Sequence, residues 1–433
     1  AEDRWFESSR AHHRLDKPFK MNTRLRIGLI SYRSNPYCGG QGVYIRHLSK
    51  ALSDLGHSVE IISGPPAPIL ESGSKLTMLP TLDLYNPEDL FRTPELRELK
   101  DPVNIIEWLG VSTMGYPEPM TFGMRANGYL RGREEKYDII HDNQCLAYSM
   151  LSIARRIPVC ATIHHPITVD RKIAVQSTRS YFKKLKHLRW YSFIGMQKYV
   201  ARRLTRILTV SEFSKQDISR QFNIDDDRFI SVPIGINTRH FYPLDHIRRE
   251  KGRIIVTNSA DTPLKGLYHL LWAMKEVLRK RSMKLVIIGT PKKKGGIEKL
   301  VKKLDLKKHI TFTGRIDHDR FLEEYARASI AVVPSLYEGF GLPAGEAMAC
   351  GTPLICTTGG ALPEVAGNAA KLVPPGDAKA LKEAIIELLD DSGKRDTLAK
   401  AGYERILRHF TWENTAINTV QAYKEVISDY NQP

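Results

Sequence analysis

The sequence predicts a two-domain protein of the α/β class, with a parallel sheet in each domain. Apolar, strand-like runs alternate with helix-like segments along the chain, which is typical of βαβ units. The series pauses near Tyr242-Pro243 and then starts again. A length of 433 residues is more than one hydrophobic core usually holds and suits two domains.

In the first half, strands are expected over residues 26–31, 58–63, 138–141, 159–163 and 207–211, with a helix over 43–55. Residues 65–130 are rich in proline and aromatic side chains. We expect long loops and short elements there, of the kind that shape a binding pocket.

In the second half, strands are expected over residues 253–257, 284–289, 310–314, 330–334 and 353–357, and helices over 266–279, 297–304, 321–328 and 378–389. A last helix is expected over 411–430. Each series should form a Rossmann-like sheet. A ligand is therefore expected at the carboxyl ends of the strands, in a cleft between the two domains.

Composition is that of an ordinary soluble protein, with 42% hydrophobic and 26% charged residues. No apolar run approaches the roughly 18 residues of a membrane helix. Residues 1–20 are polar, so we interpret them as a poorly ordered extension before Met21 rather than a secretory signal. The five scattered cysteines, with no C-x-x-C, argue against a disulfide framework or zinc site and favour the cytoplasm.

The formal net charge of +17 is unevenly distributed. Residues 171–211 contain eleven Lys or Arg and no Asp or Glu, interleaved with aromatic residues. This combination suits peripheral contact with an anionic membrane. The alternative is a solvated basic helix whose aromatic side chains pack inward. Nucleic acid is an unlikely partner by this pattern, because no recognition motif for it appears.

The segment 334–346 is the strongest functional signal. Glu338 and Glu346 lie eight residues apart, around a turn that contains Gly339 and Gly341. An apolar strand leads in and a short helix leads out, so the turn and the helix start offer free N–H groups to an anion. Because carboxylates repel phosphate, Glu338 and Glu346 are expected to accept hydrogen bonds from hydroxyls of the ligand. A ligand with hydroxyls next to phosphate is a nucleotide sugar. The alternative is that the glutamates only compensate the helix dipole.

Lys265 lies just beyond a predicted strand, where its charge could neutralise a diphosphate leaving group. A surface lysine is the alternative. Gly39 and Gly40 follow the first strand and suit close approach to a phosphate or sugar, although a flexible turn explains them equally well. His164 ends the strand over 159–163 and could position a hydroxyl. A metal pair with His165 is disfavoured, because adjacent residues of an extended chain point in opposite directions.

These residues resemble the family 4 glycosyltransferases, retaining enzymes of the GT-B fold, over residues 24–425. The matching pieces are Gly39-Gly40, Thr162-Ile163-His164, Thr209 to Ser214, Pro233 to Asn237, Phe241-Tyr242-Pro243, Lys265-Gly266, the E-x7-E of Glu338 and Glu346 with Ala347 to Pro353, and Phe410-Thr411-Trp412-Glu413. The set is specific for the family and much less so for the substrate.

The resemblance implies a hexosyltransferase, which moves a sugar from a UDP- or GDP-sugar to an acceptor hydroxyl. No metal-binding motif is visible in the sequence, so we expect the enzyme to work without a metal or other cofactor. Residues 21–243 would form the acceptor side and 244–410 would bind the nucleotide sugar. Residues 411–433 would form a helix that crosses back to the first domain. The acceptor could be a sugar, a glycolipid or a small molecule, with envelope polysaccharide or glycolipid synthesis as one setting.

The resemblance also assigns site roles. Glu346 would bind the ribose, Glu338 the donor sugar or its reacting face, Lys265 the phosphates, and His164 the sugar near the reaction centre. The other donor-binding residues would be Gly39, Gly40, Ser259, Arg315, Ile316, Gly339, Phe340, Gly341 and Leu342, with Arg315 and Ile316 against the base.

One position departs from the family pattern. The family usually has an arginine six residues before the lysine, and this chain has Ser259. Arg33 or a basic residue of the acceptor side could supply the missing charge, or the donor could be held differently. A non-catalytic nucleotide-sugar-binding or regulatory protein stays open as an alternative, as does a sugar phosphorylase or epimerase of the same architecture.

Overall fold

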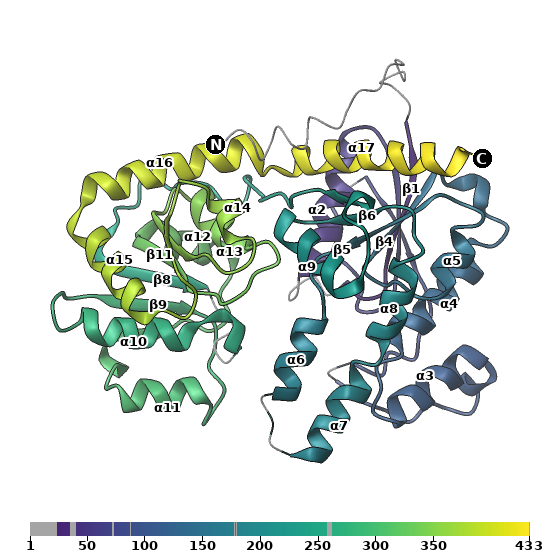
Figure 1. Ribbon diagram of the computed structural model, residues 1–433, viewed down its shortest axis with the longest axis horizontal. Helices are drawn as coiled ribbons and strands as arrows, with labels where there is room; N and C mark the ends of the chain where they lie inside the picture. Colours follow the sequence, from purple (N-terminus) through teal and green to yellow (C-terminus); the bar gives the residue numbers. More distant parts are fainter. Residues whose placement is uncertain are drawn as a thin grey trace.

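The computed structural model describes residues 24–34, 40–71, 73–86, 88–176, 178, 180–257 and 262–432. The predicted extension over residues 1–20 lies outside the described residues, and so do Gly39 and Ser259. The described chain forms two parallel-sheet α/β domains, which lie side by side in Figure 1. The predicted fold class is therefore confirmed.

The first domain contains a seven-stranded parallel sheet in the order β3-β2-β1-β4-β5-β6-β7. Its strands are β1 (Arg26–Ser31), β2 (Ser58–Ser63), β3 (Lys75–Met78), β4 (Ile139–Asn143), β5 (Val159–Ile163), β6 (Ile207–Thr209) and β7 (Phe229–Ser231). Every residue of β4 and of β5 is buried. Such continuous burial is typical of a parallel sheet that helices cover on both faces.

The second domain contains a six-stranded parallel sheet in the order β10-β9-β8-β11-β12-β13. Its strands are β8 (Glu250–Thr257), β9 (Lys284–Ile288), β10 (Ile310–Phe312), β11 (Ala328–Val333), β12 (Leu354–Thr357) and β13 (Lys371–Val373). Counted within the domain, this is the Rossmann strand order 3-2-1-4-5-6, which the first six strands of the other domain share.

The helices of the first domain are α2 (Gly40–Asp54), α3 (Pro102–Ser112), α4 (Glu118–Leu130), α5 (Ser149–Ile153), α6 (Thr168–Gln176), α7 (Tyr181–Trp190), α8 (Phe193–Ala201) and α9 (Glu212–Phe222). Those of the second are α10 (Leu267–Val277), α11 (Gly296–Lys303), α12 (His318–Arg327), α13 (Leu342–Ala349), α14 (Leu362–Ala366), α15 (Ala378–Asp390) and α16 (Ser392–His409), followed by α17 (Trp412–Asn431).

Helices α3 and α4 correct the expectation that residues 65–130 hold only loops and short elements. They contain 11 and 13 residues. Pro102 and Pro119 lie in their first turns, where proline is tolerated because its missing N–H would have no partner within the helix. A buried ion pair, with 2.7 Å between Arg125 Nη1 and Glu107 Oε2, joins the two helices.

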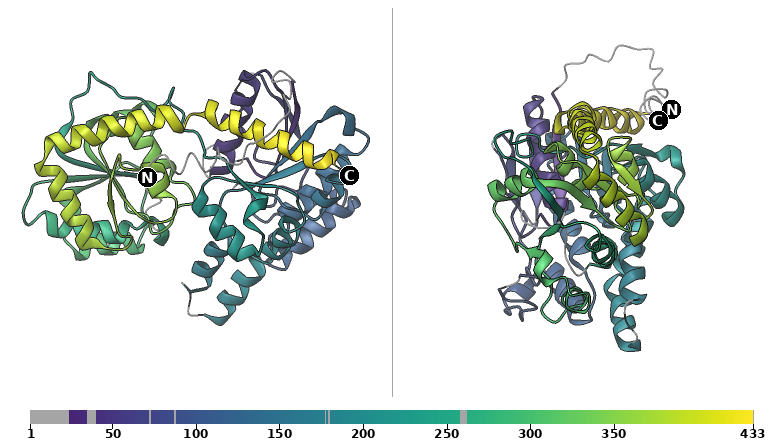
Figure 2. Two further views of the ribbon diagram at one scale, coloured as in Figure 1. Left: turned by 45° about the horizontal axis from the view of Figure 1, so that its top comes forward. Right: turned by 90° about the vertical axis from the view of Figure 1, so that its left-hand side faces the viewer.

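Helix α17 links the second domain back to the first. Figures 1 and 2 show α16 and α17 following one another along one edge of the molecule, with α17 lying against α2. The Thr415 hydroxyl donates to the carbonyl oxygen of Pro233 at 2.8 Å. Tyr423 is fully buried. These contacts tie the end of the chain to the first domain.

Candidate active site

Lys265 and Glu338 meet at the switch point of the second sheet. Lys265 follows β8 and Glu338 follows β11, the neighbouring strands between which the strand order reverses. Ligands of open parallel sheets bind at the carboxyl ends of such strands. Lys265 Nζ donates to Glu338 Oε1 at 2.7 Å, and the hydroxyl of Ser335 donates to the same oxygen at 2.8 Å.

A glycine lets the two segments approach so closely. Gly266, at the start of α10, has φ 66°, and a Cβ there would lie 1.8 Å from the carbonyl oxygen of Pro334. The N–H of Leu336 donates to the carbonyl oxygen of Leu264 at 2.7 Å. The segment that carries Lys265 is thus held against the segment that carries Glu338.

Glu346 lies one turn into α13, half-buried. Burial raises the pKa of its carboxyl to about 7, and the nearby charge of Lys265 partly offsets this rise. Gly341 precedes the helix with φ 106° and Leu342 is its first residue. The first-turn N–H groups of a helix have no partner within it, so this turn is suited to an anion beside the two carboxylates.

The same loop touches the first domain at Gly339. Its carbonyl oxygen accepts hydrogen bonds from the hydroxyls of Ser211 at 2.7 Å and Ser214 at 2.9 Å. Both serines lie at the start of α9. The next residue, Phe340, is buried, with its ring 5.8 Å from that of Phe410. The loop is therefore anchored from both domains.

His164 follows β5 in the first domain, next to this loop. Its Nε2 lies 2.8 Å from Asn143 Oδ1, and its ring is edge-on to that of Tyr44 at 4.7 Å. Its N–H donates to Gln144 Oε1 at 2.9 Å. Burial, with a smaller effect of His165, lowers the pKa of His164 to about 3. The imidazole is thus neutral near pH 7 and held in a fixed orientation.

Known glycosyltransferases match the whole of this two-domain arrangement. The pattern described as "Glycosyltransferase Family 4" matches residues 38–240, and that of "Glycosyl transferases group 1" matches residues 241–405. The "MMP alpha-(1->4)-mannosyltransferase" of Mycolicibacterium hassiacum is 42% identical over 409 residues, which cover 93% of this chain and 99% of that relative. The chain is a family 4 glycosyltransferase.

More distant proteins agree with this family and its fold. "O-antigen chain mannosyltransferase B" of Escherichia coli is 30% identical over 236 residues, 50% of this chain and 60% of that relative. The structure of sucrose-phosphate synthase from Thermosynechococcus elongatus has a TM-score of 0.71 and 25% identity and covers 94% of this chain and 100% of that one. The GT-B fold is confirmed. A binding-only protein, a phosphorylase and an epimerase are not favoured.

The remaining predicted donor residues lie at other places in the glycosyltransferase. Arg315 is exposed and follows Gly314, while Ile316 packs against the hydrophobic cluster that also holds Phe340. Gly40 begins α2, and a Cβ placed on it would meet no described atom within 4 Å beyond its chain neighbours and its own helix backbone. Gly39 and Ser259 fall outside the described residues.

Arg33 is held within the first domain. Its Nη1 lies 3.1 Å from Oε2 of the buried Glu118, whose pKa burial raises to about 7. The suggestion that Arg33 replaces the arginine absent at position 259 is therefore not supported by its contacts. His141, at the end of the neighbouring strand, does not face this site: it is buried, with Nδ1 2.6 Å from the Tyr423 hydroxyl and Nε2 2.7 Å from Thr162 Oγ1.

The sequence alone assigns no role to three residues that join the domains. The hydroxyls of Ser211 and Ser214 donate to the second domain, and the carboxylate of Glu364 accepts from backbone N–H groups of the first. Ser211 caps α9 by accepting from the N–H of Ser214 at 3.0 Å. A serine between an apolar strand and a helix is a helix-start signal. That signal predicts the cap, but it carries no information on contacts with the other domain.

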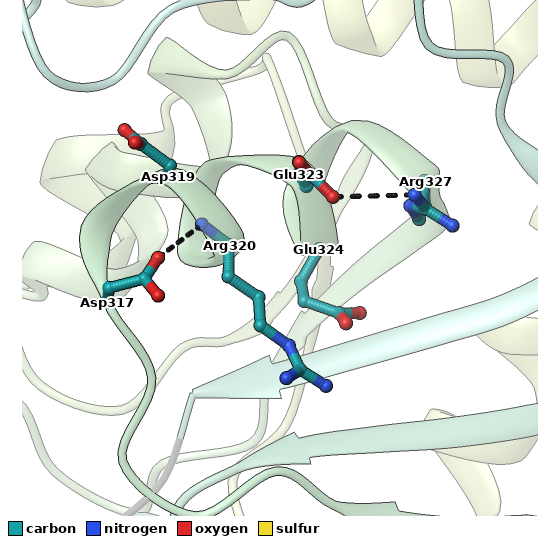
Figure 3. A pocket seen from close by; sticks show the side chains of 6 residues that line it. All are labelled: Asp317, Asp319, Arg320, Glu323, Glu324 and Arg327. Carbon is teal, nitrogen blue, oxygen red and sulfur yellow. Dashed lines mark hydrogen bonds and ion pairs between the residues drawn. The ribbon is translucent and has the colours of Figure 1, made fainter.

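A pocket on α12 contains none of the predicted site residues. It is lined by Asp317, Asp319, Arg320, Glu323, Glu324 and Arg327 (Figure 3). Asp317 caps α12 by accepting from the Arg320 N–H, and Arg327 pairs with Glu323. Glu324 pairs with Arg253, and Arg327 also lies 3.7 Å from Glu250, so charges of this pocket are used within α12 and in ion pairs to β8.

The part of the chain that the structure describes holds neither a metal cluster nor a membrane-spanning helix. In the described ranges, no group of three or more His, Cys, Asp or Glu could hold a metal ion. Over the same ranges, no helix combines the length and apolarity that crossing a membrane requires.

Proposed function

We propose that this glycosyltransferase moves a mannosyl group from a nucleoside diphosphate mannose to a hydroxyl of a saccharide acceptor. The mannosyl group is suggested by the relative with 42% identity over nearly its whole length, whose name describes an α-(1→4)-mannosyltransferase. The bond between the sugar C1 and the diphosphate breaks, the acceptor oxygen bonds to C1, and the acceptor proton is lost.

The observation that carries this proposal is the group of Lys265, Glu338 and Glu346 at the switch point. A diphosphate leaving group gains negative charge as the C1–O bond breaks, and the Lys265 ammonium and the α13 amides would stabilise it. The carboxylates would accept hydrogen bonds from the ribose and sugar hydroxyls. The neutral imidazole of His164 would contact the sugar without adding a positive charge.

The test combines donor binding with transfer. GDP-mannose, UDP-glucose and ADP-glucose would be compared by thermal shift, where a donor at 100 times its Kd stabilises by about 2.7 kcal/mol. Transfer would be followed with short α-(1→4)-mannosides as acceptors. Glu346→Ala should abolish transfer and donor stabilisation while the variant stays folded. Wild-type transfer by that variant would overturn the assigned nucleotide role.

Retention and metal independence are parts of the same proposal. An enzyme that retains configuration gives an α-mannoside from an α-linked donor, and the first-formed anomer can be read by proton NMR. Activity should persist after treatment with EDTA. A β-linked product, or activity that EDTA removes and Mg²⁺ restores, would contradict the respective part.

We also propose that α7 docks on the inner face of an anionic membrane in the cytoplasm. Tyr181 and Phe182 are 77% and 82% exposed, and Leu185 and Leu188 are about half exposed. Four cationic residues share this helix, and Figures 1 and 2 show it projecting at the end of the domain opposite α17. Exposed apolar side chains next to lysines suit a bilayer interface.

Other aromatic residues of the basic segment pack inward. The Trp190 ring stacks on that of Tyr116 at 5.0 Å, and the Phe193 ring lies 5.4 Å from it. The inward packing thus explains part of the segment and leaves the outer face of α7 to be tested. Sedimentation with phosphatidylglycerol vesicles at low salt should capture the protein, and phosphatidylcholine vesicles should not. Phe182→Ser should weaken capture. Leu96→Ser, which changes a highly exposed apolar side chain outside α7, should not.

A further inference from the structure

Glu364 binds the first domain although it belongs to the second. It lies on α14, and its Oε1 and Oε2 accept from the backbone N–H groups of Phe213 at 2.6 Å and Glu212 at 2.9 Å. These are the first two residues of α9. One carboxylate therefore spans the boundary between the domains with two hydrogen bonds.

The chemistry of a helix start makes this contact strong. The first N–H groups of α9 have no partner within the helix, and the helix dipole favours a negative charge there. Ser211 satisfies the N–H of the third residue, Ser214. The two preceding donors are satisfied by Glu364, so opening the domains would leave both without this partner and would require water to replace it.

On the side of the second domain, the contact of Glu364 with α9 is connected to the loop of residues 338–342. The N–H of Ala361, three residues before Glu364, donates to the carbonyl oxygen of Glu338 at 2.9 Å. A Cβ on Gly360 would lie 2.1 Å from that same oxygen. The segment that carries Glu364 thus lies directly on the loop that carries Glu338.

On the side of the first domain, the same helix end holds the same loop. Ser211 and Ser214 both donate to the carbonyl oxygen of Gly339. Behind α14, Arg405 donates to the carbonyl oxygens of Val365 and Glu364, each at 2.9 Å. Arg405 therefore holds the backbone that carries Glu364, and the carboxylate of Glu364 faces the start of α9.

We propose that Glu364 is a positioning residue, which holds the two domains together at α9 and thereby keeps the 338–342 loop in its donor-binding conformation. This inference rests on the proposed function for its kinetic consequence, but not for its structural one. The hydroxyl of Tyr337, which donates to Asp217 at 2.9 Å, is a second contact across the boundary. Loss of Glu364 should therefore loosen the interface without separating the domains.

The variants are Glu364→Gln, which removes the charge and turns an amide N–H toward a backbone N–H, and Glu364→Asp, which keeps the charge on a shorter side chain. Glu383→Gln is the matched control, because this glutamate lies on α15 of the same domain with a side chain 60% exposed. All three would be compared with the wild-type full-length chain.

The first measurement is hydrogen exchange without substrate. Amides 212 and 213 should exchange at least tenfold faster in Glu364→Gln than in the wild type or in Glu383→Gln, while those of β5 stay protected. Glu364→Asp should lie between them. Unchanged exchange at these amides would overturn the proposal whatever the enzyme's substrate, because it needs no catalytic assay.

The second measurement separates positioning from general damage. The donor binds to the arrangement in which Glu364 holds the two domains together. If the variant populates this arrangement less, the donor KM rises by the inverse of the fraction of molecules that still adopt it. Loss of a charged hydrogen-bond pair predicts a rise of about 10- to 100-fold in Glu364→Gln, with most of kcat kept at saturating donor. A lower kcat at unchanged KM would indicate misfolded enzyme and would refute the positioning role.

Failure of the proposed function is distinguishable from failure of this inference. If the wild type transfers no sugar from any donor tested, the function proposed above is wrong, and the hydrogen-exchange comparison still decides the role of Glu364. If the wild type is active and the exchange pattern is unchanged, only the inference about Glu364 falls.

Discussion

Gly339 of the second domain and His164 of the first are in backbone contact. A Cβ on Gly339 would lie 2.8 Å from the carbonyl oxygen of His164 and 3.1 Å from the Cβ of His165. Real Cβ atoms essentially never come within 3.0 Å of such an atom. The absence of a side chain at position 339 is therefore a condition for the two halves of the candidate site to meet.

Gly339→Ala should impair donor use more than folding. The added methyl group must push the 338–342 loop away from His164, and misplacement of about 1 Å can cost about 100-fold in rate. We expect kcat/KM for the donor to fall at least tenfold, measured by initial rates. Thermal unfolding should change little, because the domain cores are not touched.

Gly128→Ala is the matched control. Gly128 lies inside α4 with no atom within 4 Å of an added Cβ. Alanine is preferred over glycine in a helix interior by about 0.5–1 kcal/mol, so this variant should be slightly more stable and fully active. Equal activity of the two variants would show that the contact at His164 is dispensable.

Much of the fold follows from local pattern, and the reasons are visible in particular strands. Strands β1, β2 and β5 occupy the predicted ranges, because each is a short segment dominated by apolar and β-branched residues. Helices α3 and α4 were missed because proline and aromatic residues dominate their surroundings. Their prolines occupy first turns, where they are compatible with a helix.

The candidate site, like the fold, could be predicted from the sequence only in part. Lys265 and Glu338 could be placed at strand ends from sequence, and the sheet order then brings them together across a separation of 73 residues. The contact of Glu364 with α9 could not be predicted, because it spans about 150 residues and depends on how the domains face one another. Periodicity and motif spacing report on elements, and they say nothing about the orientation of two domains.

Lys265→Ala should reduce kcat for transfer by about 100- to 1,000-fold, the usual cost of removing one group that stabilises developing charge. Lys265→Arg should retain part of the rate, because it keeps the charge with a different geometry. Initial rates at saturating donor would measure both. Lys280→Ala, which removes an exposed lysine of the same domain, should leave kcat unchanged. Near-normal turnover in Lys265→Ala would exclude this residue from the reaction.

Glu346 should make stability depend on pH. Because its pKa is about 7 in the folded state and near 4.5 in the unfolded chain, the folded state keeps a proton that the unfolded state has lost between these values. The contribution of Glu346 to stability is therefore lost as pH rises through this window. Glu346→Gln, which is neutral throughout, should gain stability relative to the wild type from pH 5 to pH 8 in urea titrations. A constant difference would contradict the raised pKa.

Tyr423→Phe should destabilise the attachment of α17 to the first domain. The Tyr423 hydroxyl lies 2.6 Å from Nδ1 of the buried His141, whose Nε2 contacts Thr162 Oγ1 at 2.7 Å. Burial lowers the pKa of His141 to about 3, so the ring is neutral and both nitrogens need partners. Losing one partner should cost about 1–3 kcal/mol in urea unfolding. Tyr430→Phe, at an exposed position of the same helix, should have no effect, and equal stability of the two variants would mean that the buried pair contributes nothing.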